Sequence, residues 1–296
     1  MWIGVRQRFR RFHQNLILST DQIDDGFGKQ FRVRQALERA YYGESSDHPP
    51  GFVVGSWGKG TAVAPPTDVD VFFILPVDVY RRFEAYNGNK QSALLQEVKN
   101  HLLATYSQTT MRGDGQVVTI RFNSIDVEVV PAFLYDDQGR YCMADTNDGG
   151  RWKLVDPKAE ISLIDDEDRS ANGNVRALAQ MAKVWKRECN VPIKSYQIEI
   201  LAAVFMSQYE YRGHDYFWYD WFFRDFFRFL CGVVNRNLTI PGTGERVNLG
   251  EAWLSRAESA RDRAAKACVY ERDDLTVSAG EEWQKIFGRR IPVHVI

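Results

Sequence analysis

The chain has 296 residues, and its 38 lysines and arginines against 39 aspartates and glutamates leave a formal net charge of −1. Hydrophobic residues at 44% and charged residues at 26% are typical of globular proteins and exclude a disordered chain. The balanced charge argues against a generally basic nucleic-acid coat protein. The length corresponds to two domains or to one large one.

The first 43 residues are predicted to be helical, with a break at Gly26–Gly28, because apolar side chains recur at helical spacing on either side of it. The arginine-rich run from Arg6 to Arg11 is a solvated face or a contact for nucleic acid or a partner protein. The N-terminus has no continuous apolar segment of the kind found in secretory signals. We therefore expect a cytoplasmic protein.

Short β-type segments follow a Gly/Ser/Pro loop at residues 44–51. They are residues 52–54, 69–75, 117–122 and 125–130, with a helix at 81–105 between the second and the third. The second half of the chain is predicted to be helical, with helices at 172–189, 195–211, 218–235 and 249–272. Asn172 or Asn174 is the expected N-cap of the first of these.

The change of character from strands to helices divides the chain. The acidic run Asp165–Asp168 is interpreted as a solvated connection, which predicts domains at residues 1–168 and 169–296. The aromatic run from Tyr216 to Leu230 is interrupted by four charged residues and is too short for a membrane-spanning helix. Because it places aromatic side chains on every side of a helix, we expect most of it to be buried between helices.

The most informative segment is the turn Gly55-Ser-Trp-Gly-Lys-Gly-Thr61 after the first short strand. Its three glycines allow a tight turn that brings backbone N–H groups close to a ligand, and Ser56 adds a hydroxyl. The next strand begins with Asp68 and Asp70. Residues i and i+2 of a strand point to one face, so these two carboxylates converge.

Two adjacent carboxylates repel each other unless a cation binds between them. Mg²⁺ is commonly held by one or two carboxylates together with substrate phosphates. A third acid should come from a neighbouring strand, where Asp126 and Glu128 are again at i and i+2. Each feature alone has a simpler explanation, such as a loop glycine or a solvated strand end. Their joint order predicts nucleotidyl transfer at two metal ions.

These motifs resemble those of the polymerase-β-like nucleotidyltransferases, whose signature is a Gly-Ser turn, an Asp-x-Asp strand and a later acidic strand. The matching segments are Gly55-Ser56, Gly60-Thr61, Asp68-Val-Asp70 and Glu128-Val-Val-Pro-Ala132. Within that superfamily the chain looks most like the bacterial CD-NTases, relatives of cyclic GMP-AMP synthase and oligoadenylate synthase. The narrower resemblance covers roughly residues 30–290. It depends on three further segments: Val129–Phe133, Ala182-Lys-Val-Trp-Lys186 with Val191–Glu199, and Glu282–Gly288.

The resemblance implies a fold of the α+β class: a mixed sheet flanked by helices, a long N-terminal helix and a C-terminal helical bundle that closes the nucleotide cleft. It also implies that Asp68, Asp70 and Glu128 bind two Mg²⁺ ions, for which Mn²⁺ can substitute. Asp126 is the alternative third ligand, because the family more often has aspartate at the position of Glu128.

The remaining implied contacts are with the triphosphate of the nucleotide. They are assigned by the resemblance to Gly55, Ser56, Gly60, Thr61, Lys183 and Ser195. Two of these residues have an alternative interpretation. Lys183 could be a solvated helix residue, and Ser195 could cap the helix that follows it.

The function implied is the joining of NTPs, ATP among them, into a cyclic or linear oligonucleotide second messenger for bacterial anti-phage signalling. A HORMA-type regulatory protein and, more weakly, a nucleic-acid activator are the partners implied, and no membrane is. Two alternatives stay open at this stage: an RNA- or tRNA-terminal nucleotidyltransferase, and an inactive nucleotide-binding scaffold. The near-neutral charge disfavours the first, and the intact Asp68 and Asp70 disfavour the second.

Overall fold

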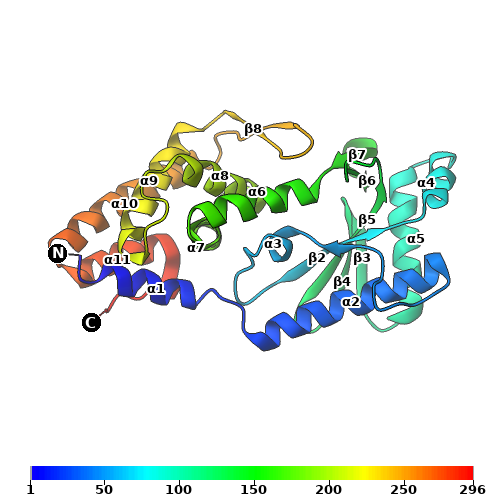
Figure 1. Ribbon diagram of the computed structural model, residues 1–296, viewed down its shortest axis with the longest axis horizontal. Helices are drawn as coiled ribbons and strands as arrows, with labels where there is room; N and C mark the ends of the chain where they lie inside the picture. Colours follow the sequence, from blue (N-terminus) through cyan, green and yellow to red (C-terminus); the bar gives the residue numbers. More distant parts are fainter. Residues whose placement is uncertain (1, 296) are drawn as a thin grey trace.

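The computed structural model describes residues 2–295 and consists of a sheet lobe and a helical lobe joined side by side (Figure 1). The sheet has seven strands: β1 (Phe52–Val53), β2 (Asp68–Ile74), β3 (Thr110–Asp114), β4 (Val117–Arg121), β5 (Asp126–Leu134), β6 (Tyr141–Asp145) and β7 (Arg151–Val155). Its order is β1-β2-β5-β4-β3, and β6 extends from the far end of β5 to pair with β7. Among the strand pairs of this sheet within residues 2–295, β2 and β5 are parallel and the others are antiparallel.

Three helices cover one face of the sheet: α2 (Thr20–Tyr42), α4 (Val77–Glu84) and α5 (Lys90–Thr105). The strands alternate buried and half-buried positions at their N-terminal ends, and Val69 and Val71 of β2 are fully buried. The half-buried positions of β2 and β5 therefore face away from this helical layer. The face of the sheet that carries these half-buried positions is directed toward the helical lobe (Figure 1).

The helical lobe has its own hydrophobic core. Its helices are α1 (Val5–Gln14), α7 (Asn174–Glu188), α8 (Ser195–Gln208), α9 (Tyr219–Gly232), α10 (Leu254–Arg272) and α11 (Thr276–Phe287). Helix α6 (Pro157–Ser170) runs from the sheet into this lobe, and the small hairpin of β8 (Asn237–Thr239) and β9 (Arg246–Asn248) lies at its edge (Figure 1). The chain crosses between the lobes near its start, because α1 packs in the helical lobe and α2 on the sheet.

The aromatic segment is part of the core of the helical lobe, as predicted. Tyr219, Phe222, Phe223, Phe226 and Phe227 of α9 are all buried. The N-terminal arginine run has a role that neither of its two interpretations included. Arg8 is fully buried, and its Nε donates to Glu271 Oε1 at 2.8 Å. Its guanidinium also donates to backbone carbonyls near the C-terminus, so α1 fastens the end of the chain.

In the N-terminal half, one predicted helix interruption was wrong and another interruption was not predicted. Helix α2 continues through Gly26 and Gly28, and the true break lies at residues 15–19, where Ser19 forms a capping box with Gln22. A glycine inside a helix costs only about 1 kcal/mol. At Gly26 it makes room for Trp57, whose ring would lie 2.4 Å from an added Cβ. The helix predicted at 81–105 is two helices, because residues 85–89 are not helical and Asn89 caps α5.

The solvated connection predicted at Asp165–Asp168 was also wrong. These residues belong to α6, and Asp168 is buried, accepting from Arg176 Nη1 at 2.8 Å. The N-cap of α7 is Gly173 rather than an asparagine. The Asn174 amide instead donates to the carbonyls of Arg212 and His214, which fastens a loop. Strands β3, β6 and β7 and helix α11 were not predicted at all, and α10 begins at Leu254 rather than at 249.

The overall architecture agrees with the prediction of a mixed sheet flanked by helices, followed by a helical bundle. Among the described residues, none of the helices is both long and apolar enough to span a bilayer.

Candidate active site

The glycine turn lies directly against the acidic strand. Strand β1 leads into the single-turn helix α3 (Gly55–Gly58), and the Val54 N–H donates to the Asp70 carbonyl at 2.9 Å. Gly55 has a φ of +60°, and a Cβ built there would lie 1.9 Å from Asp70 Oδ2. Only glycine fits both the backbone conformation and this close approach. The backbone of the turn at Gly55 and the Asp70 carboxylate are therefore in direct contact.

Four carboxyl groups share one face of the sheet. In the parallel register of β2 and β5, Asp68 pairs with Asp126 and Asp70 pairs with Glu128. Since alternate residues of a strand point the same way, all four side chains lie on the face opposite the covering helices. Two of them accept from neutral hydroxyls: Thr67 Oγ1 donates to Asp68 Oδ2 at 2.7 Å, and Thr119 Oγ1 donates to Glu128 Oε1 at 3.2 Å. The side chains of Glu128 and Asp70 also share a hydrogen bond.

The electrostatics of this face are unbalanced. Burial raises the pKa of Asp70 to about 7, and the charges of Asp68 and Glu128 add to the effect. Burial and the charge of Asp68 likewise raise the pKa of Glu128. Like charges at short distance penalise ionisation. A bound cation would remove this penalty.

The carboxylate face fits a divalent metal by its donor chemistry. Carboxylate oxygens are the ligands that Mg²⁺ prefers. Burial and the neighbouring carboxylates raise the pKa of Asp70 although Lys59 lowers it, and a bound cation would act in the same direction as Lys59. Within residues 2–295 no group of three or more histidine, cysteine, aspartate or glutamate side chains is already arranged to hold a metal ion. The acids are thus gathered on one face, but the side chains do not converge on one point.

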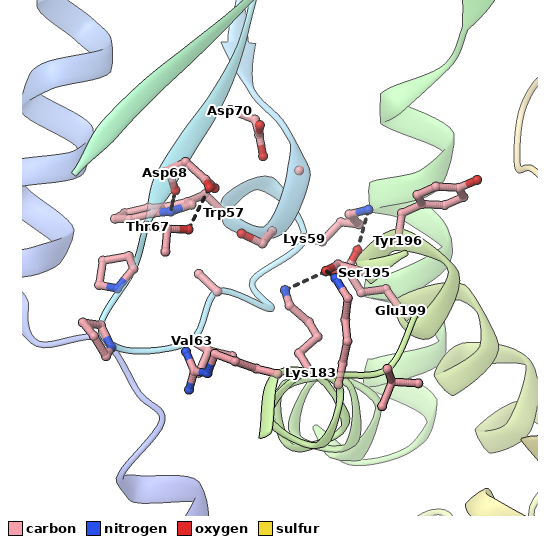
Figure 2. A pocket seen from close by; sticks show the side chains of 18 of the residues that line it. Trp57, Lys59, Val63, Thr67, Asp68, Asp70, Lys183, Ser195, Tyr196 and Glu199 are labelled. Carbon is pink, nitrogen blue, oxygen red and sulfur yellow. Dashed lines mark hydrogen bonds and ion pairs between the residues drawn. The ribbon is translucent and has the colours of Figure 1, made fainter. Parts of the chain in front are cut away.

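A cavity of about 630 Å³ separates the acids from the helical lobe (Figure 2). Asp68, Asp70, Gly55 and Ser56 line its sheet side. Its opposite side consists mainly of cationic and polar side chains from α7, α8 and the loop between them. These are Lys183, Lys186, Arg187, Asn190, Ser195 and Tyr196, and Val191, Glu199 and, from the turn, Lys59 complete this part of the lining. The cavity therefore has one acidic wall and one basic wall.

A buried charge cluster joins the two lobes at one end of this cavity. Glu199 of α8 is 2% exposed and lies 2.7 Å from Lys59 Nζ and 3.0 Å from Lys183 Nζ (Figure 2). Burial alone would raise the pKa of Glu199, but Lys183 and Lys59 outweigh it and lower the pKa to about 2. Lys59 also contacts Glu160 of α6 at 3.2 Å. The cluster is close to neutral.

One face of α7 holds the backbone that follows the glycine turn. Arg176 Nε donates to the Lys59 carbonyl, Gln180 Nε2 to the Ala62 carbonyl and Lys183 Nζ to the Thr61 carbonyl, each at 2.9 Å. The three donors are at i, i+4 and i+7, which places them in one row along the helix. The segment 59–62 is therefore fixed to the helical lobe although it belongs to the sheet lobe in sequence.

Lys186 differs from Lys183 in its surroundings. Its Nζ donates to Ser195 Oγ at 3.0 Å, and no carboxylate of the described residues forms an ion pair with it. Burial, and then the charge of Lys183, lower its pKa. A bound anion would stabilise the charged form of this ammonium, which has only a neutral hydrogen-bond partner.

The predicted residues thus fall into three groups. Asp68, Asp70, Gly55, Ser56, Lys183 and Ser195 line the cavity. Asp126 and Glu128 lie on the same sheet face but outside its lining. Gly60 and Thr61 lie behind the wall: Gly60 has a φ of +68° beside Arg176, and the fully buried Thr61 donates from Oγ1 to Glu199 at 2.5 Å.

Sequence reasoning missed Lys59, Glu199 and Lys186 as site residues. A signal existed for Glu199, because it is the only charged residue in the otherwise apolar run from Ile198 to Met206. Glutamate is almost never fully buried without a partner, so this position predicts a buried ion pair. Ser195 does not cap α8, whose N-cap is Lys194.

The fold and the two-walled cavity define a nucleotidyltransferase-like protein with an acidic strand pair beside a glycine turn. Residues 3–167, more than half of the chain, match the family described as SMODS, the Second Messenger Oligonucleotide or Dinucleotide Synthetase domain. The chain therefore belongs to this family, and the resemblance to the bacterial CD-NTases is confirmed. It is accordingly a nucleotidyltransferase that makes oligonucleotide second messengers.

Individual relatives match almost the whole chain. A cyclic AMP-AMP-AMP synthase from an Acinetobacter strain is 24% identical over 97% of this chain and 85% of its own length. The structure of CdnC with ATP from Escherichia coli MS115-1 superposes with a TM-score of 0.71 at 19% identity, covering 99% of this chain and 100% of the other. DncV cyclic AMP-GMP synthase from Vibrio cholerae, with a linear intermediate, gives 0.73 at 13% identity over 98% and 96%. These likenesses confirm the polymerase-β-like fold.

Proposed function

We propose that this enzyme joins NTPs into a cyclic oligonucleotide, with release of pyrophosphate, in a reaction that depends on Mg²⁺. The observation that supports the proposal is the pairing of an uncompensated acidic wall with a basic wall across one cavity. A metal–triphosphate complex is complementary in charge to these two walls. Its metal ions would face the acids, and its phosphate oxygens would face the lysines. The cavity matches that arrangement.

Each wall has a distinct part in the reaction. Asp68, Asp70 and Glu128 hold two divalent ions, with Asp126 as the alternative to Glu128. Such ions supply Lewis acidity for an attacking ribose hydroxyl and for the leaving pyrophosphate. The backbone at Gly55 and Ser56 cradles phosphate oxygens. Lys186 and Ser195 donate to the triphosphate from the opposite wall.

Lys183 has a different part from the phosphate contact that the resemblance assigns to it. Its ammonium is already occupied by Glu199 and by the Thr61 carbonyl. We propose that Lys183, together with Gly60 and Thr61, positions the backbone behind the phosphate-binding turn. The donor to the triphosphate is then Lys186, because its positive charge has no carboxylate partner within residues 2–295.

The product and the biological setting follow from the relatives. One relative is named for a product made of AMP units, which favours ATP as a substrate here. The CdnC:HORMA-deltaN complex, with a TM-score of 0.69 and 20% identity over 98% of both chains, favours a HORMA-type partner. We place the enzyme in the bacterial cytoplasm and in anti-phage signalling. A nucleic-acid activator stays a prediction, for which Arg10 and Arg11 are exposed candidates.

The test is synthesis by the purified protein. It is incubated with the four NTPs, each labelled in turn at the α-phosphate, with Mg²⁺ or Mn²⁺, then treated with phosphatase and separated. We expect a phosphatase-resistant product that takes up label from ATP and is missing for Asp68→Asn and Asp70→Asn. If it appears only after addition of a HORMA-type protein, the partner proposal gains support. Extension of added RNA without such a product would contradict cyclic synthesis.

A further inference from the structure

A second pocket, of about 180 Å³, lies on the other side of α7 from the nucleotide cavity. The cavity is lined by Lys183, Lys186 and Arg187. The second pocket is lined by Trp185 and Cys189, which lie about 160° and about 120° from Lys183 around the helix by the geometry of 3.6 residues per turn. The remaining lining residues come from α10 and α11. They are Arg256, Ser259, Ala260, Arg263, Lys285 and Ile286.

The pocket has an excess of positive charge. Arg263 and Lys285 share one carboxylate, Glu282, at 3.4 Å and 2.8 Å, and that carboxylate also holds Lys266 at 3.0 Å. Arg256 forms no ion pair with any residue from 2 to 295. The nearby Cys189 adds no negative charge, because burial raises the pKa of its thiol, which donates to the Ile286 carbonyl at 3.5 Å.

The second observation is an unpartnered donor in the wall of the same pocket. Trp185 lines the pocket but is fully buried, and its indole N–H, itself shielded from solvent, has no hydrogen-bond partner. An indole N–H can only donate, and a buried donor without an acceptor costs about 1–3 kcal/mol. The polar groups of the pocket wall are mainly donors: two guanidiniums, an ammonium, a hydroxyl that can also accept and, behind the surface, this N–H. None of the lining residues, all within residues 2–295, carries a carboxylate.

We propose that this pocket binds a phosphate group. A phosphate offers several acceptor oxygens and up to two negative charges, which match the donors and the excess charge, and arginine recognises it with two parallel hydrogen bonds. The volume is smaller than the roughly 300–1,000 Å³ of sites for drug-sized ligands, so it holds one phosphate or a pyrophosphate rather than a whole nucleotide. The site is separate from the proposed catalytic site and does not depend on its activity.

The test uses indole N–H signals in a ¹⁵N–¹H correlation spectrum of the whole protein during titration with inorganic phosphate at constant ionic strength. The Trp185 signal is identified by its loss in Trp185→Phe. The Trp57 indole donates to the Asp68 carbonyl at 2.7 Å and reports independently on the nucleotide cavity. We expect a saturable shift of the Trp185 signal, whatever the response of Trp57.

Matched variants decide whether the pocket is responsible. Arg256→Gln removes an exposed and unpaired charge, so the melting temperature should stay unchanged while the dissociation constant for phosphate rises at least tenfold. Arg261→Gln makes the same change on the same helix outside the pocket, where Arg261 pairs with Asp262, and should leave the dissociation constant unaltered. No saturable shift of the Trp185 signal, or equal weakening by both variants, would overturn the proposal.

Further probes distinguish the sources of the phosphate group. Pyrophosphate binding more tightly than phosphate would identify a released pyrophosphate as the ligand, whereas AMP binding most tightly would identify a nucleotide phosphate at the pocket mouth. Acetate binding as tightly as phosphate at the Trp185 signal would overturn the assignment to phosphate.

Discussion

The two walls of the nucleotide cavity differ in how their charges are balanced. On the sheet face, Asp68 and Glu128 each accept from a threonine hydroxyl, and none of Asp68, Asp70 and Glu128 forms an ion pair with a cation of residues 2–295. Burial raises the pKa of Asp70 to about 7. On the helical wall, Glu199 is held between Lys59 and Lys183, and its pKa is lowered to about 2. Both walls are rich in charge, but only the helical wall contains a compensated cluster, and Lys186 on that wall stays outside it.

This difference indicates which charges serve chemistry and which serve position. Compensated buried charges fix the geometry of the chain, as Glu199 does through the segment 59–62. Uncompensated charges cost stability in the free protein and gain their partners only from a ligand. By this criterion Asp70 and Lys186 serve ligand binding, whereas Lys183 and Glu199 fix the position of the backbone.

The largest expected effect is on activity, from Asp70→Asn. We expect at least about 10³-fold slower product formation, because removing one preorganised electrostatic group at a reacting centre costs on the order of 10²–10³ and a metal ligand at least as much. The free energy of unfolding should not fall, since a repelling buried charge is removed. Product assays and thermal unfolding measure the two quantities. Asp78→Asn, at an exposed pair with Arg81, is the control.

The opposite behaviour is expected for Glu199→Gln. Removing one partner of a buried ion pair costs about 3–5 kcal/mol of unfolding free energy. The loss of Glu199 leaves Lys183 buried without a carboxylate partner and Lys59 with Glu160 alone. Denaturant unfolding measures the loss, and Glu245→Gln, which breaks the more exposed pair with Lys153, should cost about 0–1 kcal/mol. Equal effects of the two substitutions would mean that the Glu199 cluster does not fix the lobes.

Lys186→Ala should act on substrate binding. A hydrogen bond to a charged group contributes about 1.5–3 kcal/mol, so KM for the NTP should rise about 10- to 100-fold while the melting temperature stays nearly constant. Lys183→Ala should instead lower the melting temperature, because the Thr61 carbonyl loses its side-chain donor and Glu199 loses one of its two lysine partners. If Lys183→Ala raised KM without loss of stability and Lys186→Ala had no effect, the two roles would have to be exchanged.

The smallest effect concerns acid stability. The folded pKa of Glu199 lies below its ordinary value of 4.5, so its stabilisation is complete above about pH 4.5 and is lost as the pH falls toward 2. Within this window the wild type should lose up to about 1.4 kcal/mol per pH unit more than Glu199→Gln does. Denaturant unfolding at several pH values measures the slopes, and parallel acid limbs would show that Glu199 is not the group responsible.

The chemistry-bearing segments were the part of the molecule most open to sequence reasoning. The glycine turn and the Asp-x-Asp strand are local, since both depend on residues fewer than twenty positions apart, and the structure places them in direct contact. The sheet core was predictable for a similar reason, because apolar runs such as Val69–Leu75 have the period and composition of buried strands.

What could not be predicted depends on tertiary partners. Whether Lys183 or Lys186 is neutralised is decided by the position of Glu199 on a different helix. Asp168 has the composition of a solvated residue and is buried only because Arg176 reaches it from α7. Strands β6 and β7 are five residues each and have a cysteine, a lysine and an arginine among them, so no alternation marked them as strands.

The most direct test of the two-wall account is the effect of Mg²⁺ on ATP binding, measured by calorimetry in the wild type, Asp70→Asn and Lys186→Ala. The account predicts that Mg²⁺ tightens ATP binding in the wild type and in Lys186→Ala, and that this gain is lost in Asp70→Asn. It also predicts that Lys186→Ala weakens ATP binding with and without the metal. An undiminished effect of Mg²⁺ in Asp70→Asn would contradict the assignment of the acidic wall to the metal.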